Sequence, residues 1–358
     1  MTDRLYLDHA ATTPVLPQAR AAMAQALDAW ANPSSPHADG RAARAALEQS
    51  RRDIAQALDW RHDVILASGA SEAIAIAASQ ARVERRLIGA TEHDAVGAAM
   101  GAGAAVLAVG GDGLIDLDAL DTALADGPAL VAVQLVNNET GVIQDLAAIG
   151  RRVRAAGSLL LADCAQGAGK IALPDADFIA VSGHKLGGPP GIGALLVKDL
   201  ASLAASGGQE HGYRRGTENV PAAAGLAAAL RTRAFADAMV RLAGLRDALE
   251  RAVDESGGTV IAGKAERIAT IGAYALPGVA SVSQLVQLDL AGIAVSAGSA
   301  CSSGSMKPSR VHAAMGLASD LAGSAIRVSF GPDTSQDDVD RFVAEWRRMA
   351  ARTGVRAA

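Results

Sequence analysis

The sequence is short of several residue types, and each shortage narrows what the protein can do. Only 3% of its 358 residues are aromatic, and only two are cysteines. No run of eighteen apolar residues occurs, and the N-terminus lacks a basic flank followed by an apolar core. We therefore expect no membrane association, no secretory signal and a cytoplasmic protein.

Charge and metal-binding residues are also sparse or scattered. The formal net charge is -5, with acidic and basic residues interspersed, which argues against nucleic acid as a partner. The seven histidines and two cysteines show no HxxxH or CxxC spacing, so we expect no metal site. Cys164 and Cys301 lie far apart, and a disulfide between them is disfavoured in a reducing compartment. At least one of them could therefore be a working thiol.

Lysine is much rarer than arginine in this sequence. Five of the 33 basic residues are lysines, and the other 28 are arginines. Lys185 stands in the glycine-rich stretch VSGHKLGGPPGIG, which matches neither GxGxxG nor the P-loop order. An amine that must lose its proton to attack a carbonyl has to be lysine, because arginine stays charged. The alternative is a surface lysine in a Gly/Pro turn.

The order of apolar runs predicts the fold class. Short apolar runs alternate with helical stretches as far as residue 197, and a long or broken helical stretch covers 220–256. This alternation predicts an α/β large domain, residues 14–256, with a mostly parallel sheet between helices. Residues 1–13 and 257–358 are predicted to form a smaller α+β domain, with strands at 269–274, 283–288 and 325–330.

Polar residues follow the predicted strands, where ligands bind in parallel sheets. Residues 68–72 join a strand to a helix and predict an anion site, the alternative being an ordinary N-cap by Ser71. Asp163 follows four apolar residues, and a carboxylate there is costly to bury without a cationic or donor partner. A protonated pyridine nitrogen is such a partner. The pattern favours pyridoxal 5'-phosphate, with its aldehyde on Lys185 and His93 against its ring.

The chain resembles the class V, fold-type I pyridoxal-phosphate enzymes, and among them the NifS/IscS-like cysteine desulfurases. The motifs that carry the resemblance are YLDHAATTP (6–14), NPSSPHADGR (32–41), SGASEA (68–73), TEHDAV (91–96), VNNETGVIQD (136–145), DCAQ (163–166), SGHK (182–185), RRGTENVP (214–221), GSACSSGSMKPS (298–309) and IRVSFG (326–331). They run almost from end to end, so together they are specific.

The resemblance implies a role for each matching position. Lys185 would bind the cofactor's aldehyde, Asp163 its ring nitrogen, and Gln166 its phenolic oxygen, with His93 stacked on the ring. Arg327 would bind the substrate carboxylate, with Asn138 beside the ring near the substrate. The positions that match phosphate-binding residues of the family are Ala70, Ser71, Ser182, His184 and, acting in the neighbouring subunit of a homodimer, Thr217.

Cys301, in the loop AGSACSSGSMKP, determines which reaction the resemblance implies. In the family the matching thiolate takes sulfur from L-cysteine, which leaves a persulfide on the enzyme and releases L-alanine. A sulfur-acceptor protein, either an iron–sulfur scaffold or another sulfur carrier, would receive that sulfur. The alternatives are selenocysteine lyase or another class V aminotransferase-type activity, and a cofactor-free binding protein that kept the fold. Cys164 is interpreted as a buried structural cysteine.

Overall fold

The computed structural model describes residues 4–298 and 309–352. A seven-stranded sheet forms the large domain, in the order β2-β8-β7-β6-β5-β3-β4. The strands are β2 (Asp63–Ala67), β8 (Gly193–Val197), β7 (Phe178–Ser182), β6 (Leu159–Asp163), β5 (Ala129–Gln134), β3 (Arg85–Gly89) and β4 (Ala105–Leu107). All neighbours pair in parallel except β8, which is antiparallel to β2 and β7. The predicted α/β fold with a mostly parallel sheet is confirmed.

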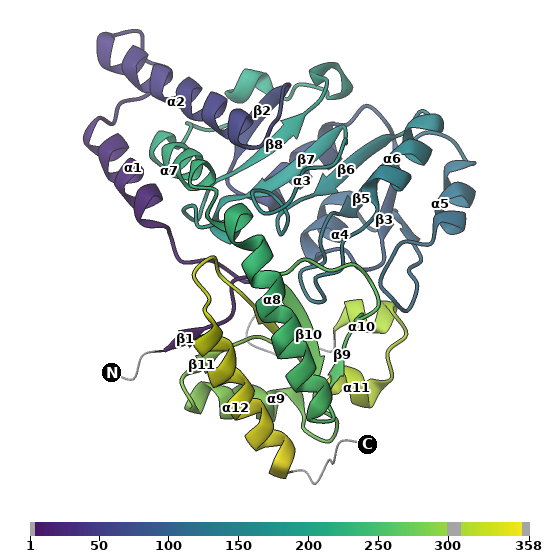
Figure 1. The fold of residues 1–358 in the computed structure, drawn as a ribbon. Helices are drawn as coiled ribbons and strands as arrows, with labels where there is room; N and C mark the ends of the chain where they lie inside the picture. The colour runs from purple at the N-terminus through teal and green to yellow at the C-terminus, as the bar shows by residue number, and fades with distance from the viewer. Residues whose placement is uncertain (1–3, 299–308, 353–358) are drawn as a thin grey trace.

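Helices cover both faces of this sheet (Figure 1). On one face lie α3 (Ala70–Gln80) and α4 (Asp94–Met100), and on the other lie α2 (Ala38–Ala57), α5 (Leu117–Leu124), α6 (Leu146–Ala155) and α7 (Val220–Arg231). Helix α1 (Pro17–Asp28) packs on α7. Alternate residues of a strand point to opposite faces, so Leu130 joins the α3 side while Val131 joins the α2 side. Burial on both faces explains the continuous apolar runs of these strands.

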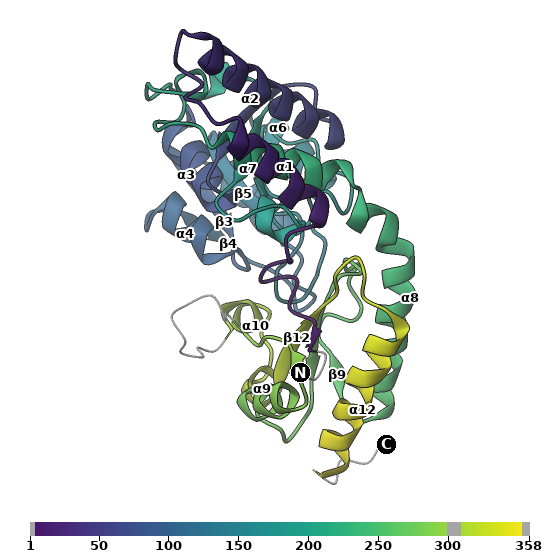
Figure 2. The same cartoon turned by 90° about the vertical axis from the view of Figure 1, so that its left-hand side faces the viewer.

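A smaller unit packs below the sheet (Figures 1 and 2). Its sheet has the order β12-β10-β9, from β9 (Thr259–Val260), β10 (Ile271–Ala275) and β12 (Ala325–Ser329). A second pair joins β1 (Leu5–Tyr6) to β11 (Ile293–Ala294) in parallel. This unit also contains the helices α9 (Ser281–Leu290), α10 (Arg310–Ala314), α11 (Ser319–Gly323) and α12 (Gln336–Arg352).

The long helical stretch is broken at Arg233, whose φ of 54° lies in the left-handed region. Helix α8 (Ala234–Glu255) follows the break and runs down beside α12 (Figure 2). Its buried side chains, including Leu242 and Leu249, share one core with Leu7 and Trp346. The domain boundary after residue 256 stays a prediction, and α8 packs with the smaller unit along much of its length.

The strand predicted at 283–288 is wrong, because these residues belong to α9. The side chains of α9 that are buried are Gln284 and Leu288, which are four residues apart and therefore on one helical face. Gln284 Nε2 donates to the carbonyls of Val279 at 2.8 Å and Ser324 at 2.6 Å. Because one residue of the buried face is a glutamine, the apolar residues alone do not show the helical spacing. Its hydrogen-bonded amide N–H groups allow it to be buried.

Candidate active site

A cavity of about 450 Å³ opens where β2, β5, β6 and β7 end. Nine of the predicted site residues line it: Ala70, Ser71, His93, Asn138, Asp163, Gln166, Ser182, His184 and Lys185. They come from segments more than a hundred residues apart in sequence, and the parallel strands bring them to one edge. The structure therefore gathers in one place the polar groups that the strand ends predicted.

Three predicted residues are not among those lining the cavity. Thr217 is exposed in the segment before α7. Arg327 lies on β12, and its Nη1 donates at 3.0 Å to the backbone carbonyl of Asn138, a cavity residue. Its side chain is only 4% exposed, so Arg327 is not a solvent-facing strand arginine. Cys301 lies outside the described residues.

The N-terminus of α3 forms one end of the cavity. Its N-cap residue is Gly69, with no hydrogen bond from a capping side chain, so the predicted alternative of a Ser71 cap is wrong. A side chain at Gly193 would lie 2.6 Å from the Gly69 Cα, which shows how closely β8 approaches this turn. The first backbone N–H groups of a helix lack partners within it and carry a partial positive charge. This end of the cavity suits an anion.

An ion pair that the sequence analysis missed stands beside this helix end. Arg214 Nε donates to the Glu72 carboxylate at 3.0 Å, and the backbone N–H of Ser68 donates to the same group. Burial alone would raise the pKa of Glu72, but these hydrogen bonds outweigh it and lower that pKa below its usual value. The guanidinium thus balances a carboxylate that would otherwise repel an anion.

Asp163 lies at the end of β6 and is 9% exposed. Its carboxylate accepts a hydrogen bond from the backbone N–H of Ala165 at 2.9 Å. Glu92 is buried nearby, and burial raises its pKa well above its usual value. Burial and the charge of Asp163 likewise raise the pKa of the Cys164 thiol well above its usual value, so Cys164 stays an uncharged, inert thiol. A carboxylate in these surroundings suits a cationic or donor partner.

His93 is the N-cap residue of α4 and faces the cavity. Its Nδ1 accepts a hydrogen bond from the backbone N–H of Ala95 at 3.1 Å, so the neutral ring carries its proton on Nε2. Burial, together with the Lys185 charge, lowers the pKa of His93 below 6.5. The ring is therefore neutral at pH 7, with a donor at Nε2.

Lys185 ends a short 3₁₀ turn, Gly183–Lys185, that follows β7. The N-terminal segment holds this turn: Thr13 N–H donates to the His184 carbonyl at 2.8 Å, and His184 Nδ1 lies 3.1 Å from Thr12 Oγ1. Gly187 has a φ of 86°, which a residue with a side chain rarely adopts. Glycine at this position lets the chain turn back directly after the lysine.

Gln166 connects the cavity to the same N-terminal segment. Its Nε2 donates to the Ala10 carbonyl at 2.8 Å, while its Oε1 is buried and has no hydrogen-bond partner among the described residues. Sequence reasoning gave no role to residues 10–13, although the stretch YLDHAATTP was part of the resemblance. The motif was visible, but its contacts across more than 150 residues of sequence were not.

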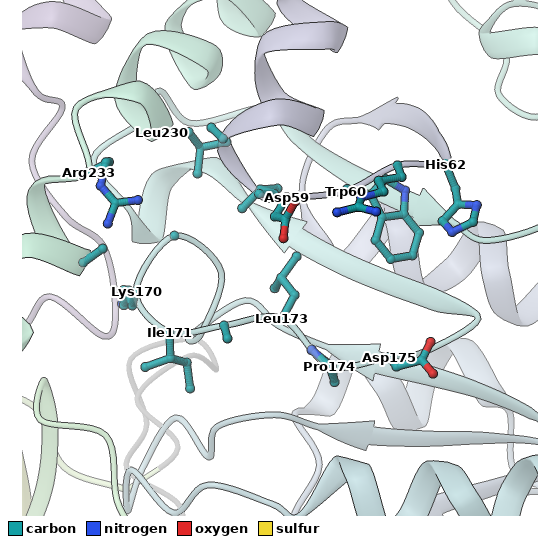
Figure 3. Close-up of a pocket in the computed structure, with 16 residues that line it drawn as sticks. Asp59, Trp60, His62, Lys170, Ile171, Leu173, Pro174, Asp175, Leu230 and Arg233 are labelled. Carbon is teal, nitrogen blue, oxygen red and sulfur yellow. The ribbon is translucent and has the colours of Figure 1, made fainter.

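A larger hollow of about 660 Å³ lies between the α2–β2 connection, the β6–β7 connection and the α7–α8 junction (Figure 3). Trp60 and His62 stand on one side of it, and Lys170 and Arg233 on the other (Figure 3). Asp175, on its wall, is bound by Lys198 at 2.6 Å and by Arg154 at 3.1 Å. Its charged groups are exposed, with the exception of the buried Lys170.

The part of the chain that the structure describes contains neither a membrane-spanning helix nor a cluster of metal-binding side chains. No helix there is long and apolar enough to cross a membrane. Residues 4–298 and 309–352 also contain no group of three His, Cys, Asp or Glu side chains that could hold a metal ion.

Comparison with known proteins shows what this chain is similar to. The aminotransferase class-V family model matches residues 5–342. A cysteine desulfurase of Frankia sp. is 38% identical, covering 94% of this chain and 88% of the relative. A cysteine desulfurase of Bradyrhizobium diazoefficiens is 35% identical, covering 95% of this chain and 92% of the relative. The solved structure of a NifS-like protein from Rickettsia africae is 29% identical, with a TM-score of 0.87 over 98% of this chain and all of that one.

Proposed function

Since the chain belongs to the aminotransferase class-V family, we propose that it is a cysteine desulfurase that binds pyridoxal 5'-phosphate through Lys185. The observation that carries the proposal is the meeting of Asp163, His93 and Lys185 in one cavity below the uncapped N-terminus of α3. Its substrate is L-cysteine, and its products are L-alanine and an enzyme-bound persulfide.

The groups in the cavity fit this cofactor. The buried Oε1 of Gln166, which has no hydrogen-bond partner among the described residues, suits a polar ligand. Asp163 suits a protonated ring nitrogen, the N–H groups of Ala70 and Ser71 suit a phosphate, and the Lys185 amine suits an aldehyde. When bound, pyridoxal phosphate supplies an electron sink for the carbanion formed by loss of the substrate's α proton. Ser182 and His184 complete the set of residues that would hold the phosphate.

The side chains around the cofactor position would bind the substrate and move its protons. Arg327 binds the amino-acid carboxylate, because a planar guanidinium can donate two parallel hydrogen bonds to it. Lys185 removes the α proton once its amine is released. His93 assists as an acid–base group, since a neutral ring with its proton on Nε2 can donate that proton toward the cavity. Asn138 lies between Arg327 and the cavity and helps to orient the substrate.

Cys301 would carry out the sulfur transfer. Its thiolate attacks the sulfur of the bound cysteine and forms an S–S bond. The Cβ–S bond breaks, and its electron pair stays on the carbon skeleton. That carbon takes up a proton and leaves as part of L-alanine, so the sulfur remains on Cys301 as a persulfide. A class V enzyme that uses no thiol, such as an aminotransferase, would leave Cys301 unmodified.

The proposed assembly is a homodimer that passes its sulfur to an acceptor protein. Thr217 is exposed, as expected of a residue that serves the neighbouring subunit's phosphate. The acceptor would be an iron–sulfur scaffold or another sulfur carrier. The low cysteine content supports a location in the reducing cytoplasm.

The test compares the wild type with Cys301→Ala and, as a matched control, Cys164→Ala. After exposure to L-cysteine, intact mass should rise by one sulfur in the wild type and in Cys164→Ala but not in Cys301→Ala. The visible absorbance of the bound cofactor should be the same in all three. Continued L-alanine production by Cys301→Ala with normal cofactor content would contradict the persulfide reaction.

A further inference from the structure

The guanidinium of Arg327 already has an anionic partner within the chain. Its Nη2 donates to Oδ1 of Asp8 at 2.7 Å, and its Nη1 donates to the Asn138 carbonyl at 3.0 Å. Its Nε is buried and has no hydrogen-bond partner among the described residues. The Arg327 side chain is 4% exposed and that of Asp8 is 20% exposed. Asp8 is therefore the member of the pair that water can reach.

The backbone around Asp8 fixes where its carboxylate lies. Segment 7–10 runs along β12, where Ser329 N–H donates to the Leu7 carbonyl at 2.8 Å and Ala10 N–H donates to Ser329 Oγ at 2.9 Å. The Asp8 carbonyl accepts a hydrogen bond from the Ala11 N–H at 3.1 Å. None of these bonds uses the Asp8 carboxylate, so the side chain can change without loss of the segment's backbone bonds.

Other acidic groups near Arg327 have different partners. Glu139 is buried and accepts a hydrogen bond from Ser309 Oγ at 2.6 Å, and burial raises its pKa. Tyr6, whose pKa is raised first by burial and then by the Asp8 charge, donates its hydroxyl to the Thr12 carbonyl at 2.9 Å. Among the described residues, Asp8 is thus the carboxylate that directly neutralises Arg327 when no substrate carboxylate is present.

We infer that Asp8 is a built-in competitor for the substrate carboxylate: it occupies Arg327 until an amino-acid carboxylate displaces it. This inference rests on the proposed binding of that carboxylate by Arg327. Displacement keeps one anion beside the buried guanidinium at every stage, which avoids an uncompensated buried charge. It also means that ligands without a carboxylate gain nothing from Arg327. Asp8 would therefore weaken the binding of every carboxylate ligand. A ligand would displace Asp8 well only if it also made its other contacts in the cavity.

The expected effect follows from the fraction of Arg327 that is free to bind. If Asp8 occupies the guanidinium most of the time, the apparent affinity for a carboxylate ligand is the intrinsic affinity multiplied by the small fraction of Arg327 that is free. Asp8→Asn keeps an oxygen that can accept the Nη2 hydrogen bond but removes the negative charge. We expect its dissociation constant for L-alanine to fall by about three- to thirtyfold, with the KM for L-cysteine falling in the same direction.

The experiment is calorimetric titration of cofactor-loaded protein with L-alanine, and with ethylamine as a probe that lacks the carboxylate. Asp8→Asn should bind L-alanine more tightly and ethylamine unchanged. The matched control is Asp289→Asn, which removes the carboxylate of a surface pair with Arg4 that is more than 60% exposed. It should change neither titration. Unchanged or weaker L-alanine binding in Asp8→Asn, with an unchanged thermal melting curve, would overturn the inference.

A third variant separates this inference from the proposed function. Arg327→Gln should weaken L-alanine binding while leaving ethylamine binding unchanged. If it does so and Asp8→Asn has no effect, the competitor role of Asp8 fails and the carboxylate site stands. If Arg327→Gln leaves L-alanine binding unchanged, the carboxylate site itself is wrong.

Discussion

The two hollows described above differ in how far their polar side chains are buried and hydrogen-bonded, and this difference does not follow their sizes. The larger, of about 660 Å³, is walled by exposed His62 and by Asp175, which two neighbouring basic residues already bind. The smaller, of about 450 Å³, holds a buried carboxylate at Asp163 and, at Gln166, an amide oxygen without a hydrogen-bond partner in the described part of the chain. Groups whose bonding is incomplete, converging from separate strands, distinguish a reactive site from a surface recess.

The largest effect is expected at Lys185, which lines the smaller cavity and is compared with Lys198, the partner of Asp175 on the wall of the larger hollow. Lys185→Ala should abolish the visible absorbance of bound cofactor and lower L-alanine production about a thousandfold or more, because the described residues that line the cavity include no second lysine. Lys198→Ala removes an exposed lysine beside the larger hollow and serves as the matched control. Absorbance and turnover are both measured after incubation with pyridoxal phosphate. Comparable losses in the two variants would contradict the assignment.

Lys170 provides a second and smaller test, because it belongs to the wall of the larger hollow but is buried. Its Nζ lies 4.7 Å from the centre of the Phe235 ring, and burial, followed by the Lys185 charge, lowers its pKa from 10.5 to about 7. Between these pH values the unfolded chain binds more protons than the folded one, so wild-type stability rises with pH. Above pH 10.5 this penalty is absent, and below about pH 7 it is complete.

Lys170→Met removes the titrating group and keeps the volume. The pKa difference alone corresponds to about 4 kcal/mol at pH 7, and loss of the cation–π contact offsets about 1 kcal/mol of it. We expect the variant to be more stable than the wild type at pH 7 by about 2 kcal/mol or more, and the gain to shrink toward pH 10. Denaturant melts at several pH values measure it, with Lys198→Met as control. A gain independent of pH would show that the Lys170 charge is not responsible.

The smallest effect is expected from substitutions in the wall of the larger hollow. His62→Ala and Trp60→Phe alter the wall of the larger hollow without touching the cavity that holds Lys185. Turnover and KM should stay within about twofold of the wild type, as is usual for substitutions away from a reacting centre. A tenfold change in either constant would give the larger hollow a part in the reaction.

The sequence contained enough to predict the sheet and most of its polar edge. Buried strands between helices have a strong periodic signal, and a polar residue directly after such a strand stands out, as Asp163 and Lys185 do. The lysine's scarcity added to that signal. The uncapped start of α3 was less visible, because SGASEA reads equally well as a helix capped by Ser71.

Other features depended on contacts that a one-dimensional pattern does not contain. Helix α9 was predicted as a strand because its buried face includes Gln284, whose amide N–H groups are hydrogen-bonded inside the core. The pairing of Asp8 with Arg327 joins residues separated by 319 positions. Many other charged residues lie within that separation, so the sequence alone could not identify Asp8 as the partner of Arg327.

The N-terminal strand sets an order of events for synthesis of the chain. Strand β1 pairs with β11, and Leu7 receives its backbone bond from Ser329, whereas the strands of the large sheet all lie within residues 63–197. On a ribosome the large sheet can therefore assemble while residues 5–9 still lack their partners in β11 and β12. Residues 5–9 dock only after β11 and β12 have been synthesised, and their docking brings Asp8 to Arg327. The pairing of Asp8 with Arg327 therefore forms later than the large sheet.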